Sequence, residues 1–297
     1  MTRSVTLVTP SYAKDIERFT LQRESIERCG IDLPHCALIN HEDMGLFAKI
    51  PFQRNLRLIS TQDLLTPRFE ARRLGWGRRR REIEYWRGRP PIHGWYIQQL
   101  LKLAAPQIVE TEGIICLDSD TLFVDRVTAD DFYAPDGRLY LFETEDDVDC
   151  EMGEWYIRSL KFLGESLRQR PVRRTTHSPV PMHRQVMLDM QAHIEKQHGV
   201  FWMEAMARAE SIMEYSTYGV YARYLDKFQH TTPAHPNSLS LYYWFGDEMA
   251  NQFADLVERV RAEKPKTVLI NSNQGHPVSS YRTLIEQAWA IQDRENP

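Results

Sequence analysis

The spacing of apolar and polar residues predicts two kinds of structure along this chain. In the first half, short apolar runs between Pro, Gly or polar residues predict strands, and stretches with helical spacing separate them. The predicted strands cover residues 4–9, 35–40, 56–60, 113–117, 121–124 and 138–143, and the predicted helices cover residues 14–29 and 95–105. We expect the first strand to stop at Pro10 and the first helix to end at Gly30.

From about residue 150 the apolar spacing becomes mostly helical. Helices are predicted over residues 181–197, 201–213, 217–227, 247–263 and 279–291, and one late strand over residues 267–271. Because strands and helices alternate at the start of the chain, we expect the α/β class. The predicted architecture is a Rossmann-like mixed sheet flanked by helices, with a mainly helical C-terminal part, in a single domain spanning residues 1–297.

Asp118 and Asp120 are the first candidates for site chemistry. They directly follow the apolar run 113–117, and side chains i and i+2 of an extended chain point to the same side. Open α/β sheets bind ligands at the carboxyl ends of their strands. Paired carboxylates there suit Mg²⁺ or Mn²⁺ that also binds a phosphate. A solvated turn after a strand is the alternative interpretation.

One face of the predicted helix at 95–105 is the second candidate. Trp95, Gln98, Gln99 and Lys102 share this face, whereas the apolar side chains on the other face can pack on the sheet. An indole, two amides and a cation just ahead of the Asp118 strand suit a phosphate or a sugar. The alternative is an ordinary amphipathic helix with Trp95 as a packing residue.

The exit of the first strand is the third candidate. Thr9 and Ser11 supply hydroxyl groups there, and Asp15 follows in the first helical turn, so this turn can hold a nucleotide base and ribose. A plain helix cap by Ser11 is the alternative. No glycine-rich phosphate loop is present, so the sequence supports neither dinucleotide binding nor P-loop chemistry.

Two single residues complete the set of candidates. His276 lies on a glycine-containing loop after the late strand, where an imidazole can complete a metal shell; a surface loop histidine is the alternative. Glu214 opens a helical segment beside tyrosines able to stack on sugar rings, and its carboxylate is a candidate general base. A charge that interacts with the helix dipole is the alternative for Glu214.

The composition is that of a folded intracellular protein. Of 297 residues, 42% are hydrophobic and 26% are charged, with a net charge of −4. Four cysteines without a CxxC pair fit reduced thiols in the cytoplasm better than disulfides or a zinc site. We expect no signal peptide, because the N-terminus lacks a long apolar region, and no stretch approaches a membrane span.

Charge is distributed unevenly along the chain. Nine arginines lie between Arg68 and Arg89, interleaved with three aromatic residues, and a smaller arginine cluster spans residues 168–174. Such a patch suits an anionic membrane face or a phosphorylated, lipid-linked molecule that accepts a transferred group. Nucleic acid is less favoured. Charge that is simply solvated is the alternative. An acidic run, residues 143–147, is either a solvated loop or an acceptor site.

These segments together resemble the GT-A glycosyltransferases. The features that carry the resemblance are a hydrophobic strand ending in Asp-Ser-Asp, a GWxxQQxxKL helix before it, a first strand ending in TPSY, an EYxxYG element and a late loop histidine. More narrowly, the set is similar to a bacterial family with a GT-A-like fold that is often found with polysaccharide or lipopolysaccharide genes. The resemblance covers roughly residues 4–280.

The resemblance implies a metal-dependent glycosyltransferase. A sugar would pass from a nucleotide-diphosphate donor, with a UDP-sugar favoured, to a saccharide or glycolipid acceptor in bacterial surface polysaccharide synthesis. Asp118 and Asp120 would meet Mn²⁺ or Mg²⁺, Ser119 would join the donor site, and His276 would be the late metal ligand. With Glu214 as base, transfer is expected to invert the anomeric centre, although no motif reports stereochemistry.

The resemblance also implies a division of labour and a location. Residues 1–148 would bind the nucleotide-sugar and the metal, and residues 149–297 would form a mainly helical acceptor half with a late strand and loop. The expected location is cytoplasmic and peripheral, on the inner face of the cytoplasmic membrane.

Two other functions remain open from the sequence. A haloacid-dehalogenase-type phosphatase would use Asp118 as nucleophile and Asp120 as general acid, and Gly246-Asp247-Glu248 mimics its late acidic motif. More than 100 residues precede the Asp-Ser-Asp triplet, which counts against this function, and we expect no hydrolysis of p-nitrophenyl phosphate. The third function is a non-catalytic carbohydrate- or membrane-binding module, which 13 tyrosines and 7 tryptophans would suit.

Overall fold

A computed structural model of the chain defines its helices and strands. It describes residues 3–65, 69–74, 81–86, 92–168, 171–176, 178–209, 212–236, 239–243, 255–272 and 275–295. The α-helices are α1 (Ile16–Arg28), α2 (Met44–Phe47), α3 (Thr61–Leu64), α4 (Gly94–Ala104), α5 (Glu151–Phe162), α6 (Arg184–His198), α7 (Trp202–Arg208), α8 (Glu214–Tyr224), α10 (Leu256–Glu263) and α11 (Arg282–Glu295). The strands are β1 (Val5–Ser11), β2 (His35–Ile39), β3 (Leu56–Ser60), β4 (Phe69–Leu74), β5 (Arg81–Trp86), β6 (Ile92–His93), β7 (Gly113–Cys116), β8 (Thr121–Phe123), β9 (Leu139–Phe142), β10 (Thr144–Asp146), β11 (Val172–Arg174), β12 (Val180–His183), β13 (Thr231–Ala234), β14 (Ser240–Tyr243) and β15 (Thr267–Ile270).

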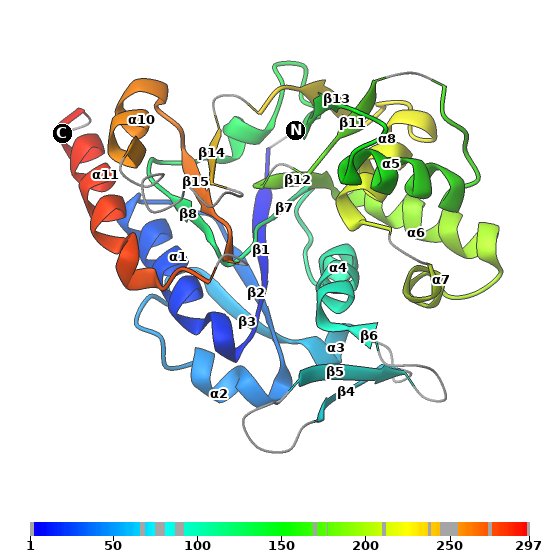
Figure 1. Ribbon diagram of the computed structural model, residues 1–297, viewed down its shortest axis with the longest axis horizontal. Helices are drawn as coiled ribbons and strands as arrows, with labels where there is room; N and C mark the ends of the chain where they lie inside the picture. Colours follow the sequence, from blue (N-terminus) through cyan, green and yellow to red (C-terminus); the bar gives the residue numbers. More distant parts are fainter. Residues whose placement is uncertain are drawn as a thin grey trace.

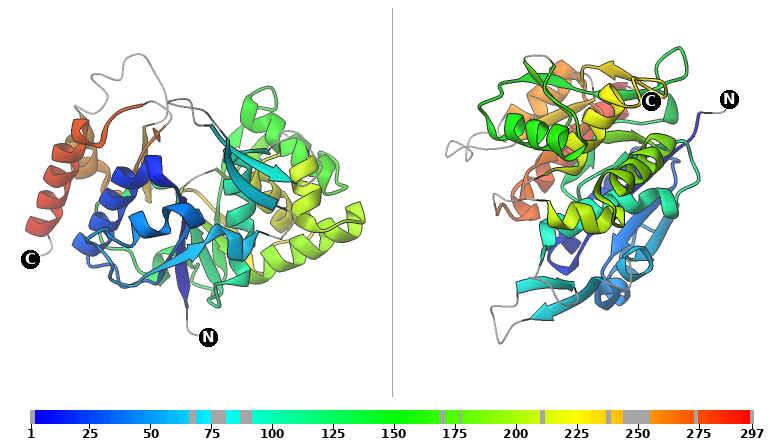
Figure 2. Two further views of the ribbon diagram at one scale, coloured as in Figure 1. Left: turned by 90° about the horizontal axis from the view of Figure 1, so that it is seen from below. Right: turned by 90° about the vertical axis from the view of Figure 1, so that its right-hand side faces the viewer.

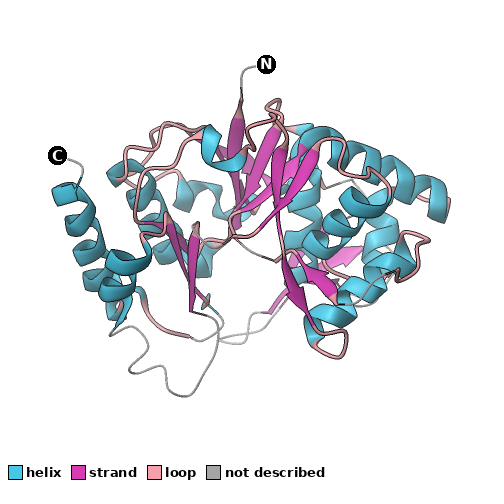
Figure 3. Cartoon of the chain, turned by 90° about the horizontal axis from the view of Figure 1, so that it is seen from above, coloured by secondary structure: helices cyan, strands magenta, loops and turns pink. Residues whose placement is uncertain are grey.

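A five-stranded mixed sheet forms the centre of the molecule. Its strand order is β12-β7-β1-β2-β3, in which β7, β1, β2 and β3 run parallel and β12 runs antiparallel to β7. Helices α1, α10 and α11 lie on one side of these strands and α4 to α8 on the other (Figure 1). From above, the strands run between two groups of helices (Figure 3). The predicted α/β class, a mixed sheet flanked by helices, is confirmed.

The two halves of the sequence share their sheets. Strand β12, from the second half, completes the central sheet beside β7, and β15 pairs with β8 from the first half. Strand β13 likewise pairs with β9. The backbone therefore does not divide into two packing units at residue 148, and a functional division there stays a prediction.

Strand β1 continues through Pro10, so the predicted stop at that residue is wrong. The N–H of Leu7 donates to the carbonyl of Pro34 at 2.8 Å, so odd-numbered residues of β1 bond toward β2 and even-numbered residues toward β7. Strand β7 ends at Cys116, opposite Val8. Pro10, which has no N–H, therefore faces a position beyond the end of β7, where the ladder needs no donor.

The predicted elements agree with the structure best in the first half of the chain. Residues 180–183 form strand β12, although the predicted helix began at 181; the helix α6 starts only after them. Helix α5, over residues 151–162, had no counterpart among the predicted elements. Of the helix predicted at 247–263, the described part is α10, and residues 244–254 lie outside the described residues.

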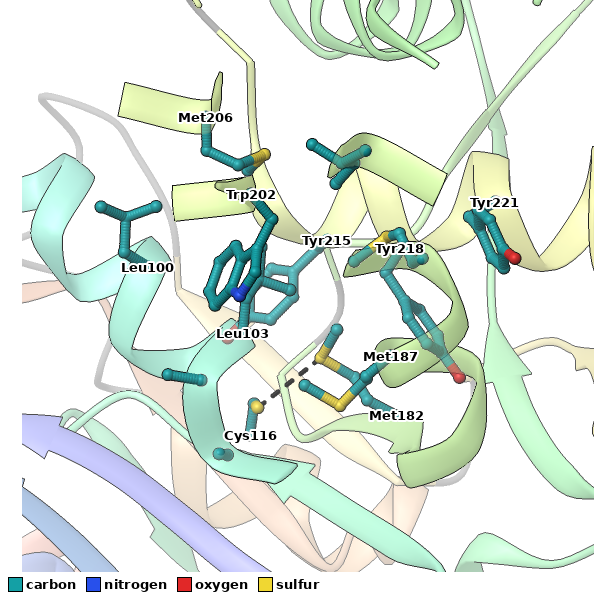
Figure 4. Close-up of a cluster of buried hydrophobic side chains, with 14 of the residues drawn as sticks. Leu100, Leu103, Cys116, Met182, Met187, Trp202, Met206, Tyr215, Tyr218 and Tyr221 are labelled. Carbon is teal, nitrogen blue, oxygen red and sulfur yellow. Dashed lines mark hydrogen bonds between the residues drawn. The ribbon is translucent and has the colours of Figure 1, made fainter. Parts of the chain in front are cut away.

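The largest hydrophobic core lies between the central sheet and helices α4 to α8. Figure 4 shows part of it, where Leu100 and Leu103 of α4 meet Trp202 and Tyr215 from α7 and α8. Beneath them the thiol of Cys116 lies 3.7 Å from the sulfur of Met182. This packing fixes α4 and α8 over the end of β7, which carries the Asp-Ser-Asp triplet.

A second core lies on the other side of the sheet. It joins α1, α10 and α11 to the small sheet β14-β15-β8. Seen from below, α1 and α11 lie on the same side of the molecule (Figure 2). Trp289 of α11 donates its indole N–H to the carbonyl of Phe123 in β8 at 2.9 Å. The C-terminal helix is therefore fastened to the strand that follows the Asp-Ser-Asp triplet.

The arginine-rich segment includes two strands of a separate antiparallel sheet. Strands β4 and β5 pair with each other and β6 adds to β5. Residues 66–68, 75–80 and 87–91 of this region, with arginines 68, 78, 79, 80, 87 and 89, lie outside the described residues. Its predicted contact with a membrane or acceptor stays a prediction. Among the helices described, none combines the length and hydrophobicity needed to cross a membrane.

Candidate active site

The Asp-Ser-Asp triplet lies at the carboxyl end of β7, beside the end of β1. The N–H of Leu117 donates to the carbonyl of Val8 at 2.9 Å, so the chain leaves β7 in contact with β1. The side chain of Asp118 is 39% exposed, whereas Asp120 is buried. The predicted position at a strand end, which is where parallel sheets bind ligands, is therefore correct. The expected extended geometry is wrong, because residues 119–120 form a turn in which the N–H of Thr121 donates to the carbonyl of Asp118 at 3.0 Å.

Gln22 of α1 holds the backbone of this turn. Its side-chain amide donates to the carbonyl of Asp118 at 2.7 Å and to that of Thr121 at 3.0 Å, and the side chain is fully buried. Ser25, one turn further along α1, accepts a bond from the N–H of Phe123. Sequence analysis missed Gln22, because its partners lie about 100 residues away and no local pattern marks them.

Asp120 is a buried carboxylate with one bonded and one unbonded oxygen. Its Oδ2 accepts the backbone N–H of Ser272 at 2.8 Å, whereas its buried Oδ1 has no hydrogen-bond partner among the described residues. Burial, and then the neighbouring charge of Asp118, raises the pKa of Asp120 to about 7, against the opposing effect of the Ser272 bonds. Ser272, which follows β15, brings the C-terminal part of the chain to this carboxylate.

Lys102 is a buried cation between two carboxylates. Its ammonium lies 2.8 Å from Asp118 Oδ1 and 3.0 Å from Glu214 Oε1, and 4.6 Å from the ring centre of Tyr215. Burial acts to lower the pKa of Lys102, but the charges of Asp118 and Glu214 outweigh it and hold that pKa well above its ordinary value. Lys102 is therefore charged at neutral pH and fixed at the end of β7.

Glu214 lies beneath Lys102, at the start of α8. Its side chain is only 2% exposed, its backbone N–H donates to Gln99 at 3.2 Å, and its Oε2 is buried without a partner in the described part of the chain. Burial raises the pKa of Glu214, and the charge of Lys102 opposes this shift. Glu214 thus lies at the candidate site, as the sequence predicted. Because its carboxylate is buried, we favour a role in holding the Lys102 ammonium over a role as a base that contacts an acceptor hydroxyl.

Asp15 and Ser119 also meet at this strand end. Asp15 bonds to Arg18 at 2.9 Å and to the hydroxyl of Ser119. Burial raises the pKa of Asp15, and the charge and hydrogen bond of Arg18 offset this only in part. Arg18 also donates to the backbone carbonyl of His276 at 3.2 Å and bonds to Tyr281. Arg18 and Tyr281, which sequence analysis missed, therefore tie α1 to the C-terminal loop beside the triplet.

The other predicted donor residues lie in different environments. Thr9 is fully buried, and its hydroxyl lies 3.0 Å from the ring of His35 in the interior. Ser11 is buried at the end of β1, with a hydroxyl that has no partner among the described residues. Gln98 is half-buried on α4. Thr9 therefore has no surface for a nucleoside, whereas Ser11 lies at the correct end of its strand.

The second acidic run pairs with the smaller arginine cluster. Across the β10–β11 ladder, Glu145 lies opposite Arg173 and forms an ion pair at 2.9 Å. Glu143 pairs with Arg223 of α8, and Asp146 lies 4.0 Å from Arg174. These charges are neutralised within the protein, so this run favours a structural role in the antiparallel β10–β11 pair over an acceptor site.

A divalent cation fits the two aspartates of the triplet. The unbonded, buried Oδ1 of Asp120 is a hard donor, and Mg²⁺ is usually held by one or two carboxylates together with substrate phosphates. Within the described residues, no three His, Cys, Asp or Glu side chains gather closely enough to hold a metal on their own. His276 therefore does not complete a three-residue group with Asp118 and Asp120, and its role as a ligand stays a prediction.

Comparison with protein families identifies this chain. A model described as "Family of unknown function (DUF6492)" matches residues 4–280. The protein belongs to this family. A comparison with curated proteins found no match for this DUF6492 protein.

Solved structures similar to the DUF6492 chain include two of the galactosyltransferase LgtC. One is a complex with donor and acceptor sugar analogues, with a TM-score of 0.45 and 12% identity over 80% of this chain and 75% of that one. The other is an active-site mutant, with a TM-score of 0.46 and 10% identity over 89% of this chain and 86% of that one.

Proposed function

We propose that this DUF6492 protein is a glycosyltransferase that moves a sugar from a nucleotide-diphosphate donor to a saccharide or glycolipid acceptor. The observation that carries the proposal is the pair Asp118 and Asp120 at the end of a parallel strand. One carboxylate is half-exposed and the other has an unbonded oxygen. This arrangement suits a divalent cation that bridges the protein and a diphosphate.

Asp118 and Asp120 would hold Mn²⁺ or Mg²⁺. When bound, the cation would neutralise the charge that develops on the leaving diphosphate. Ser119 and Asp15, which bond to each other, and Ser11 at the end of β1 would form the donor side of the site. Thr9 is not part of this donor site, because it is buried against His35.

Lys102 would place a fixed positive charge beside the leaving group. Its position between Asp118 and Glu214 is set before any ligand binds, so little reorganisation is needed during reaction. We assign Glu214 to holding this ammonium. Inversion with Glu214 as the base stays a prediction, which the anomeric configuration of an isolated product would test.

The broader biological setting also stays a prediction from the sequence. It comprises UDP as the donor nucleotide, surface polysaccharide synthesis, and a peripheral location on the inner face of the cytoplasmic membrane. The late Gly246-Asp247-Glu248 motif of the phosphatase alternative lies outside the described residues.

A thermal-shift screen tests the proposed function. UDP-, GDP- and CMP-sugars are added with and without Mn²⁺, since a ligand that binds the native state raises its apparent stability. We expect a metal-dependent shift with at least one donor, and slow donor hydrolysis by the same preparation. Asp118→Ala should remove both. No shift with any nucleotide, or p-nitrophenyl phosphate hydrolysis that depends on Asp118, would contradict the proposal.

A further inference from the structure

Two tryptophans from different helices meet at the surface on the same face of α4 as Lys102. The rings of Trp95, on α4, and Trp155, on α5, have centroids 6.0 Å apart, and Tyr96 adds an edge-on contact to Trp95 at 5.1 Å. Trp95 is 37% exposed, and Trp155 and Tyr96 are half-buried. We call Trp95, Tyr96 and Trp155 the aromatic platform.

The aromatic platform lies on the same face of α4 as Lys102, which is buried in the candidate active site. Trp95 and Lys102 are seven residues apart on α4, which is two turns, or about 10 Å along the axis. Gln98 lies between them on the same face and is half-buried. A ligand on the platform would therefore extend past an amide toward Asp118, which is the exposed partner of the buried Lys102 ammonium.

We propose that the aromatic platform binds a sugar ring of the saccharide acceptor. Aromatic side chains offer a large apolar surface beside a polar rim, which suits a ring with one apolar face and hydroxyl groups around its edge. Gln98 supplies an amide at that rim. This inference rests on the proposed function, because it names the acceptor side of the same site.

The neighbouring charges favour a sugar over a lipid surface. Glu154 and Arg158 flank Trp155 on α5, form an ion pair at 3.5 Å, and are exposed. Glu151 adds another exposed carboxylate at the start of the helix. Because Arg158 neutralises Glu154, the repulsion of anionic lipids comes from Glu151. Carboxylate groups accept hydrogen bonds from hydroxyl groups, and amide groups both accept and donate them.

Binding of simple disaccharides tests the aromatic platform. The full-length protein is titrated with lactose, maltose and cellobiose, followed by saturation-transfer NMR and tryptophan fluorescence. We expect at least one disaccharide to bind the wild type. Trp95→Leu and Trp155→Leu should each weaken it about tenfold, equivalent to about 1.4 kcal/mol. Trp95→Tyr should restore most of the affinity, because it keeps an aromatic face.

Leu46→Ala is the matched control. Leu46 is another exposed apolar residue, 43% exposed on α2, away from the aromatic platform, and its loss should leave sugar binding unchanged. Urea unfolding of each variant shows whether it is folded. The proposal is overturned if no disaccharide binds, or if Leu46→Ala has the same effect as Trp95→Leu. Binding to phosphatidylglycerol vesicles is measured in parallel, and the proposal is also overturned if Trp95→Leu loses vesicle binding but keeps disaccharide binding.

The outcome can be separated from that of the proposed function. If Trp95→Leu keeps the wild-type thermal shift with nucleotide-sugar and Mn²⁺ but loses disaccharide binding, both inferences hold. If disaccharide binding depends on Trp95 while no nucleotide ever binds, the aromatic platform stands and the transferase assignment fails. If nucleotide binds and both tryptophan variants keep full disaccharide affinity, only the platform fails.

Discussion

Two acidic clusters that look alike in the sequence differ in the folded protein. In the antiparallel β10–β11 pair, Glu145 has an arginine directly opposite it in the ladder. At the end of β7, Asp120 is buried, keeps one oxygen without a partner among the described residues, and has its pKa raised to about 7. Carboxylates that the protein itself neutralises support the pairing of two strands, whereas a buried carboxylate with an oxygen that lacks a partner is a candidate for binding an external cation.

The largest effect on stability is expected at Lys102, whose buried ammonium contacts both Asp118 and Glu214. Lys102→Met removes the partner of Glu214, which is buried, and of Asp118. Loss of one partner of a buried ion pair costs about 3–5 kcal/mol, because the other charge stays desolvated. Urea unfolding measures this. Adding Glu214→Gln to Lys102→Met should recover part of the loss; no recovery would show that the Lys102–Glu214 pair is not the cause.

Asp120→Asn should separate function from stability. The amide keeps an oxygen for the N–H of Ser272 but loses the negative charge, so we expect sugar transfer to fall about 100-fold or more. Folding stability should be unchanged or higher, because a desolvated charge is removed. Transfer kinetics and urea unfolding are compared on one preparation. A variant that loses stability but keeps transfer would show that Asp120 serves the fold and not the reaction.

The pH dependence of stability is expected to differ between wild type and Asp120→Asn. The pKa of Asp120 is about 7 when folded, against 3.8 as its ordinary value, so between these values the folded state holds the extra proton. Stability contributed by this proton is lost as the pH rises from about 4 to about 7. Urea unfolding in metal-free buffer should show wild type losing stability relative to the variant over that window; a constant difference would contradict the buried, incomplete carboxylate.

The smallest effect is expected in the antiparallel β10–β11 pair. Glu145→Gln breaks a solvent-exposed ion pair with Arg173, which is worth about 0–1 kcal/mol, and should leave donor binding and transfer unchanged. Thermal unfolding and the nucleotide-sugar shift measure the two effects. A clear loss of transfer at unchanged stability would return residues 143–147 to the list of acceptor-site candidates.

Local patterns were sufficient for part of this site. Asp118 and Asp120 follow a run of apolar residues, and the helical spacing of α4 places Trp95, Gln98 and Lys102 on one face, so short-range sequence predicted them. Gln22, Arg18 and Ser272 could not be found in this way. Each bonds to a residue that is distant in the chain, and its role depends on which strands pair.

The same reasoning explains the corrections. Pro10 looked like a stop because proline lacks a donor, but the missing donor faces a place where β7 has already ended. Residues 181–183 looked helical together with the segment after them, yet they pair with β7. Thr9 looked like a surface hydroxyl, but His35 from the next strand covers it. In each case a long-range neighbour outweighed a local preference.

The amino-acid sequence by itself determined the central strands and the two long helices of the first half, the α/β class, and the presence of two carboxylates at a strand end, although the short helices α2 and α3 and the strands β4, β5, β6 and β10 were not predicted. These follow from periodicity and from residues that are adjacent in the chain. Only the tertiary structure decided that Lys102 joins Asp118 to Glu214, that the acidic run pairs with arginines, and that Trp155 meets Trp95. Burial and charge pairing depend on contacts between distant segments, and those contacts exist only once the sheet and both helical layers have assembled.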